Sequence, residues 1–208
     1  MISSLFMLFC ASALIAVFTP GPAVMLALQN STLYGWRRTA LSSLGNISGL
    51  LVLASASAVG LGAVLRSSAT LFLLLKLVGA GYLIYLGVKQ WRAAGNAGPI
   101  QHARIENRTH FSLYREGLFL ALSNPKAILF ITALFPQFIV RDQALVPQLV
   151  LMTLTFMCMS FSALMTYAVI GYLAGSSFVN AMRSRGFRRT TGSLFVLMGA
   201  GLLTLKSS

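Results

Sequence analysis

Residues 4–28 read SLFMLFCASALIAVFTPGPAVMLAL, a stretch that contains no charged residue. About 20 mainly apolar residues suffice to cross a bilayer as a helix, so this stretch is predicted to be a membrane span. Near its end, Thr19, Pro20, Gly21 and Pro22 interrupt the apolar run. Each proline lacks an N–H donor and clashes with the preceding turn, so we expect the helix to kink or break here.

A break inside a span has two interpretations. It is either a simple packing kink or a discontinuous helix, whose freed backbone groups lipid tolerates only where they are buried in protein or face a water-filled cavity. Because two prolines flank one glycine, we favour the discontinuous helix. The sequence therefore predicts that Thr19, Pro20, Gly21 and Pro22 lie at a binding site.

The rest of the chain repeats this apolar pattern. Of the 208 residues, 57% are hydrophobic and 9% are charged, so lipid is the expected solvent. The first stretch is too long for a cleaved signal peptide and is expected to be retained. The predicted fold is an all-α polytopic membrane protein, a single transmembrane domain over residues 1–208. Its six predicted spans are 4–28, 39–65, 70–89, 117–140, 147–175 and the shorter 191–205.

The net charge of +13 is explained by where the basic residues lie between the spans. Loops on one side hold 3 Lys and Arg residues, and loops on the other hold 11, namely Arg37, Arg38, Lys89, Arg92, Arg104, Arg108, Arg115, Arg183, Arg185, Arg188 and Arg189. Because cytoplasmic loops are enriched in Lys and Arg, the richer side is predicted to be cytoplasmic, with both termini outside. This face also favours anionic lipids, and no basic–aromatic pattern indicates nucleic acid as a partner.

The longest loop, 90–116, divides the chain into two halves of three predicted spans each, 1–89 and 117–208. An odd number of spans forces the halves to be inverted relative to each other, which is a common plan in transporters. The first span of each half also carries a proline break. We therefore predict two inverted three-helix repeats.

The second break is predicted at Asn124-Pro125-Lys126 in the fourth span. Asn124 is a suitable N-cap, and Pro125 suits the first position of a helix. Lys126 then either snorkels to the interface or faces the interior, where an ionisable group is a functional candidate. Lys76, near the outer end of the third span, fits snorkelling better.

No predicted span interior contains Asp or Glu, so an inward-facing Lys126 has no obvious counter-ion in the sequence. A bound carboxylate could take that place, and helix N-termini at the breaks also favour anionic groups. Both features suit a carboxylate-bearing substrate such as an amino acid. Further pathway candidates are Asn30, Asn46 and Gln137, although Asn46 lies between packing glycines and Gln137 fits an interface position.

Catalytic motifs are missing from the sequence. The spans hold no paired carboxylates, and the chain has no phosphate-binding glycine loop and no metal-ligand spacing, so we expect no enzyme activity, metal or cofactor. A membrane thiol–disulfide carrier is a minor alternative, which requires Cys10 and Cys158 to meet. A passive channel, or an exporter of another small solute, is the other alternative.

Several motifs together resemble those of the LysE/RhtB family of bacterial amino-acid exporters, over nearly the whole chain. They are Thr19-Pro20-Gly21-Pro22, Lys76 with Gly79, Tyr82-Leu83 and Leu86-Gly87, Asn124-Pro125-Lys126, Phe135-Pro136-Gln137-Phe138, and Gly35, Gly45, Gly49 and Gly117. The resemblance implies efflux of an amino acid or close derivative across the bacterial inner membrane by proton-coupled antiport, and a homodimer. Some members carry an acid after the second glycine of the second span, where this chain has Leu50 and Leu51, so coupling is the least supported implication.

Overall fold

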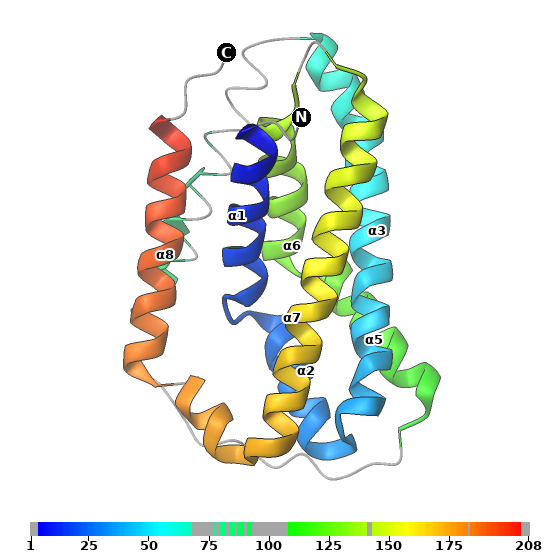
Figure 1. Ribbon diagram of the computed structural model, residues 1–208, viewed down its shortest axis with the longest axis vertical. Helices are drawn as coiled ribbons and strands as arrows, with labels where there is room; N and C mark the ends of the chain where they lie inside the picture. The colour runs from blue at the N-terminus through cyan, green and yellow to red at the C-terminus, as the bar shows by residue number, and fades with distance from the viewer. Residues whose placement is uncertain are drawn as a thin grey trace.

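The computed structural model is a helical bundle elongated along one axis (Figure 1). It describes residues 4–67, 77, 80–81, 84–85, 87–89, 91–92, 108–140, 143–182 and 184–204. The described helices are α1 (Ser4–Phe18), α2 (Pro22–Tyr34), α3 (Trp36–Ser67), α5 (His110–Ser123), α6 (Pro125–Leu129), α7 (Leu145–Met182) and α8 (Arg185–Thr204). A π-helical turn, Phe130–Leu134, and a 3-10 turn, Phe135–Phe138, follow α6. The described residues form no strand, which agrees with the predicted all-α class.

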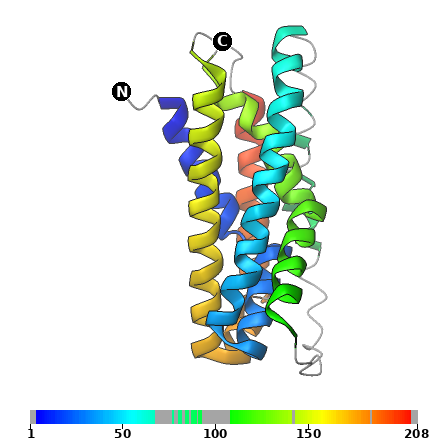
Figure 2. The same cartoon turned by 90° about the vertical axis from the view of Figure 1, so that its right-hand side faces the viewer.

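The bundle has two chemically different ends. The start of α1 and the end of α8 lie at one end, while the α2–α3 turn, the start of α5 and the α7–α8 junction lie at the other (Figures 1 and 2). We call the second end the basic end, because its segments carry Arg37, Arg38, Arg108 and Arg185. This arrangement is the one that the uneven distribution of charge between the loops predicts.

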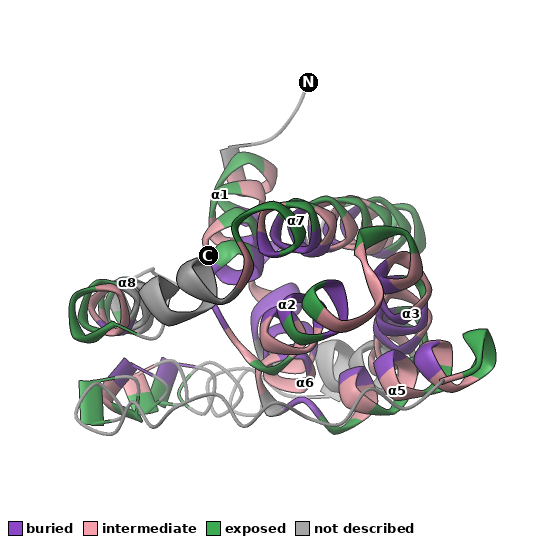
Figure 3. Ribbon diagram, turned by 90° about the horizontal axis from the view of Figure 1, so that it is seen from below, coloured by how far each residue is buried: buried purple, intermediate pink, exposed green. Residues whose placement is uncertain are grey.

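Helix α2 lies in the middle of the bundle, and α3, α5 and α7 pack around it (Figure 3). The helix faces that meet there are largely buried, whereas α7 and α8 expose their outward faces. Exposed apolar side chains on such faces suit contact with lipid. They include Leu14, Leu51, Val150, Leu154 and Leu173.

Two helices are long and apolar enough to cross a membrane by themselves, over Trp36–Ala58 and Leu145–Gly175. Two bent pairs also qualify if each counts as one broken span, so the described residues hold two to four candidate spans. The third predicted span, 70–89, lies mostly outside the described residues. The sixth falls within α8, which begins with arginines and does not qualify. The count of six and the inverted repeat stay predictions.

Local sequence explains where several helices begin and end. Helix α2 continues past residue 28 and ends before Gly35, whose φ of 81° lies in the left-handed region that glycine tolerates. Helix α5 begins at His110, inside the stretch predicted to be loop, because the Thr109 hydroxyl accepts a hydrogen bond from the Ser112 N–H at 3.2 Å. The helix that opens the predicted fourth span, 117–140, therefore starts at His110, earlier than the sequence predicts.

Helices α3 and α5 cross closely at facing glycines. A Cβ atom on Gly45 would lie 1.9 Å from the carbonyl oxygen of Tyr114, and one on Gly117 would lie 1.8 Å from the carbonyl oxygen of Ser42. Such distances leave no room for any side chain, so only glycine permits this approach. This close crossing positions α3 so that Asn46 lies toward the centre of the bundle.

Candidate functional site

The break predicted in the first span is present between α1 and α2. Helix α1 ends at Phe18 and α2 begins at Pro22, with an angle of 48° between the two segments. Pro22 stands in the first turn, where the helix needs no N–H from it, and no side chain caps α2. Thr19 is buried, so the broken backbone lies inside the protein.

Side chains from two other elements bind the carbonyl groups freed at this break. Tyr167 on α7 donates its hydroxyl to the carbonyl oxygen of Phe18 at 2.5 Å. Lys126 on α6 donates from Nζ to the carbonyl oxygen of Thr19 at 2.7 Å. Both contacts hold the end of α1 against helices that lie more than 100 residues away in the chain.

The second break separates α5 from α6, and the segments on either side are bent by 56°. Asn124 is extended there, with φ of −78° and ψ of 106°, and its Oδ1 accepts the Lys126 N–H at 3.1 Å. The predicted N-cap is therefore confirmed. The cap places Lys126 in the first turn of α6, and its side chain reaches the first break. Of the two interpretations offered for Lys126, the structure adopts the interior position.

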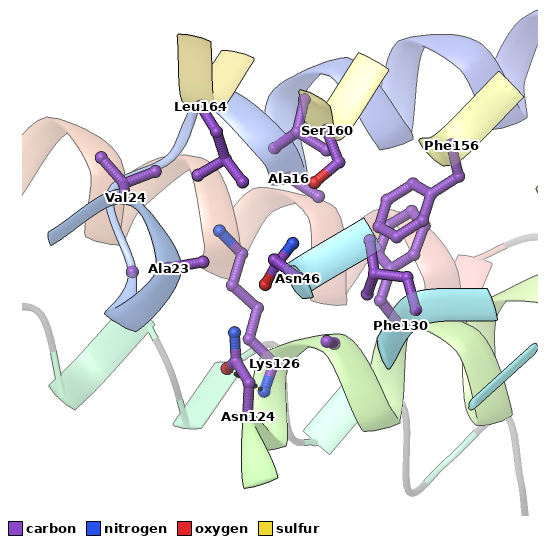
Figure 4. Close-up of a pocket in the computed structure, with 14 residues that line it drawn as sticks. Ala16, Ala23, Val24, Asn46, Asn124, Lys126, Phe130, Phe156, Ser160 and Leu164 are labelled. Atoms are coloured by element: carbon purple, nitrogen blue, oxygen red, sulfur yellow. Dashed lines mark hydrogen bonds between the residues drawn. The ribbon is translucent and has the colours of Figure 1, made fainter. Parts of the chain in front are cut away.

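A cavity of about 50 Å³ lies beside Lys126, between the two breaks (Figure 4). Its polar side chains are Lys126, Asn124, Asn46 and Ser160, which come from α6, its cap, α3 and α7. The wall is otherwise apolar and includes Leu50, Phe130, Phe156 and Leu164. Gly21 completes it, and a Cβ atom there would lie 3.4 Å from Cδ of Lys126. Within the described part of the chain, the site thus combines one cation with three neutral polar groups.

Aromatic side chains close the cavity toward the end where α1 starts. Phe130 and Phe156 stack with their ring centroids 4.7 Å apart and their planes at 10°. Beyond them, the fully buried Phe9 packs edge-on against Phe135 at 5.3 Å and Phe138 at 5.6 Å. This cluster joins α1, α7, the π-helical turn and the 3-10 turn, so movement of these elements relative to one another would separate its rings.

Asn30 lies near the basic end and does not line the cavity. Its amide donates to Glu116 Oε2 at 3.4 Å, and Glu116 Oε1 pairs with Arg108 Nη1 at 2.7 Å. Arg38 in turn donates to the carbonyl oxygen of Arg108. These bonds tie α2, α3 and α5 together. The sequence places Glu116 at the edge of the fourth predicted span, but its partners could not be predicted, because a carboxylate at a loop edge gives no sign of what it contacts.

The remaining predicted residues are placed as follows. Pro20 and Pro22 shape the first break without lining the cavity, and the partly buried Gln137 lies in the 3-10 turn, also outside it. Lys76 lies outside the described residues. Ser160 lines the cavity but was not predicted, since a single serine in an apolar helix belongs to no motif.

Broken helices around an internal polar cavity are the plan of a membrane transporter. A family model described as LysE type translocator matches residues 14–206, a range that includes both breaks. The chain therefore belongs to the LysE type translocator family, which confirms the resemblance seen in its motifs. This family consists of transporters, so the expectation that the chain is not an enzyme is also confirmed.

Several bacterial membrane and efflux proteins are similar to nearly the whole chain. The homoserine/homoserine lactone efflux protein of Salmonella typhi is 32% identical over 188 residues, and that of Salmonella typhimurium is 31% identical, each covering 90% of both chains. An uncharacterized membrane protein of Pseudomonas aeruginosa is 33% identical over 202 residues, which cover 90% of this chain and 89% of the relative. No solved structure matches the chain.

The bond from Tyr167 to the first break can be tested by Tyr167→Phe. Removal of the hydroxyl leaves the Phe18 carbonyl without this donor, so we expect the unfolding free energy to fall by about 0.5–2 kcal/mol. Thermal unfolding in detergent measures the change. Tyr172→Phe on the exposed face of the same helix is the matched control and should have no effect. Equal melting temperatures for both variants would contradict the role of Tyr167.

Proposed function

We propose that this chain is a secondary transporter that exports a small amino acid of the homoserine class across the bacterial inner membrane, in exchange for protons. The observation that carries the proposal is the Lys126 ammonium, held inside the bundle at the first break and beside a cavity. The efflux proteins of Salmonella, which match nearly the whole chain, support both the substrate class and the outward direction.

Lys126 is the binding group for the substrate carboxylate in this proposal. Of the described residues that line the cavity, Lys126 is the charged one. A carboxylate is a stronger acceptor for its ammonium than the Thr19 carbonyl that it now contacts. We expect the substrate to displace that carbonyl. Substrate binding would then remove the contact between Lys126 and the Thr19 carbonyl, so that α1 and α2 can move relative to each other at the first break.

The end of α1 suits the substrate's ammonium group. Pro20 has no N–H, so it cannot donate to the carbonyl of Ala16, and Ala16 lines the cavity. Carbonyl groups at a helix C-terminus also attract positive charge. Among the described residues, no carboxylate lines the cavity, so a second positive charge on the substrate would lack a partner there. These features favour a neutral side chain over a basic one.

Export requires the cavity to open at each end in turn. A volume of about 50 Å³ holds a few water molecules, so the helices must move to admit an amino acid. The aromatic cluster around Phe9 closes one end, and the Asn30–Glu116–Arg108 contacts tie the helices at the basic end, which is cytoplasmic by its charge. A break in each half of the chain also suits inverted repeats that rock against each other.

Glu116 is the proposed coupling group. Its carboxylate contacts Arg108 and Asn30 at the basic end, and protonation would remove the ion pair and weaken its hold on α2. Proton binding and opening toward the cytoplasm would then be linked through one residue. The homodimer stays an implication of the family resemblance, and the contacts with anionic lipids stay a prediction from the charge distribution.

The central experiment is uptake of radiolabelled homoserine into inside-out proteoliposomes with an imposed proton gradient. The wild type should accumulate homoserine, and a protonophore should abolish the accumulation. Lys126→Gln is expected to reduce the initial rate by about tenfold or more, because it removes the carboxylate partner. Lys89→Gln, which replaces an exposed lysine of the described part, is the matched control.

Two outcomes would contradict the proposal. Full activity of correctly folded Lys126→Gln would remove the carboxylate site. Movement of homoserine only down its own gradient, with no response to a protonophore, would identify a passive channel.

Glu116→Gln tests the coupling group. The variant keeps an amide that Asn30 can contact but loses the charge that pairs with Arg108. We expect it to equilibrate homoserine across the membrane without accumulating it, whereas Glu116→Asp should retain part of the accumulation. Internal pH and homoserine are recorded together in the same proteoliposomes. If Glu116→Gln still accumulates homoserine at the wild-type level, the coupling group lies elsewhere.

A further inference from the structure

Two buried polar side chains in the cavity have no hydrogen-bond partner among the residues that the structure describes. Asn46 on α3 is 4% exposed, Ser160 on α7 is 8% exposed, and neither side chain makes a hydrogen bond within the described part of the chain. Most other buried polar residues described there do make one. They are Thr19, Asn30, Ser31, Thr39, Ser42 and Asn124.

Ser160 also makes no hydrogen bond to the backbone of its own helix within the described residues. A serine or threonine in a helix commonly returns its hydroxyl to the carbonyl one turn earlier, as Thr166 does to Ser162 at 2.8 Å. Ser160 makes no such bond, and its hydroxyl points into the cavity (Figure 4). The oxygen is therefore available to a molecule in the cavity.

Both unpaired groups face the space that Lys126 enters. Figure 4 shows Asn46 beside the Lys126 side chain and Ser160 across the cavity from α6. A third unpaired hydroxyl, on Ser43, lies one helical turn from Asn46 and lines the adjoining smaller cavity with it. Buried polar groups in native proteins normally bond to protein or to ordered water, so unpaired groups around these adjoining cavities are free to bond to a molecule that enters them.

We propose that Asn46 and Ser160 form a subsite that binds a hydroxyl group on the side chain of the transported amino acid, and that they set its specificity. The proposal rests on the proposed function and adds the residues that select the substrate. Lys126 holds the carboxylate, while the amide of Asn46 and the hydroxyl of Ser160 supply one donor and one acceptor to a hydroxyl. Leu50, Phe130 and Phe156 surround the subsite with apolar surface.

The expected selectivity follows from desolvation. An amino acid without the hydroxyl would fill the cavity and leave both polar groups buried and unpaired. Sites built to bind a hydroxyl reject such analogues strongly for this reason. The wild type should therefore transport homoserine at least about tenfold faster than 2-aminobutyrate, which differs only by the missing hydroxyl.

The test compares both amino acids in proteoliposomes containing wild type, Ser160→Ala or Ser162→Ala. Ser160→Ala removes one oxygen atom and should lower the homoserine rate about tenfold while changing the 2-aminobutyrate rate less than about twofold. Ser162→Ala, on the exposed face of the same helix, should match the wild type. Asn46→Leu provides a second variant, and it should show the same loss of preference for homoserine.

Each other outcome overturns the assignment. Equal losses for both amino acids in Ser160→Ala would mean that the residue binds a group common to both or supports the fold. An unchanged preference in Ser160→Ala and Asn46→Leu would mean that water occupies the subsite. A wild type that transports both amino acids equally well would refute the subsite but leave the exporter intact. A wild type that transports neither would refute the proposed function as well.

Discussion

The hydrogen bond from the Lys126 ammonium to the Thr19 carbonyl joins the two helix breaks at the centre of the bundle. Each partner would be costly alone. A buried carbonyl without a donor costs about 1–3 kcal/mol, and a lysine within a membrane span is more costly still. Together they allow α1 to end and α6 to begin deep inside the protein, and the cavity lies beside their contact.

The other polar residues of the described interior fall into two groups around this bond. The first group is paired and fixes the framework, with Tyr167 on the Phe18 carbonyl and Asn124 on the Lys126 N–H. The second group is unpaired, with Asn46 and Ser160 facing the cavity and Ser43 lining the adjoining smaller one. A protein surrounded by lipid has little water to satisfy buried polar groups, so this division separates structural positions from binding positions.

Local sequence was sufficient to predict both breaks. Prolines disrupt a helix through their own covalent structure, and Asn124 caps α6 through a bond to a residue two positions away. The basic end was also predictable, because charge placement reports topology. The sequence does not decide whether the Lys126 side chain reaches the membrane interface or faces the interior of the bundle, because this depends on which helices pack beside it.

Other features depended on tertiary contacts that the sequence does not reveal. Helix α5 begins inside the stretch predicted to be loop, because the Thr109 side chain caps it by accepting the Ser112 N–H. Asn30 was predicted to lie on the pathway, and its contact with Glu116 toward the basic end could not be foreseen from the sequence. Ser160 belongs to no sequence motif. Two features of the structure mark it as a candidate, namely its position in the cavity wall and the lack of a hydrogen bond from its hydroxyl within the described residues.

Solid-state NMR on protein in lipid bilayers tests the central bond most directly, with lysine labelled by 15N at Nζ and threonine by 13C at the carbonyl carbon. A direct bond from Nζ of Lys126 to the Thr19 oxygen requires a dipolar coupling over about 3–4 Å. We expect this coupling in the wild type, its loss in Lys126→Gln, and its decrease when homoserine is added. A wild type without the coupling would contradict the account, because Lys126 would then not join the two breaks.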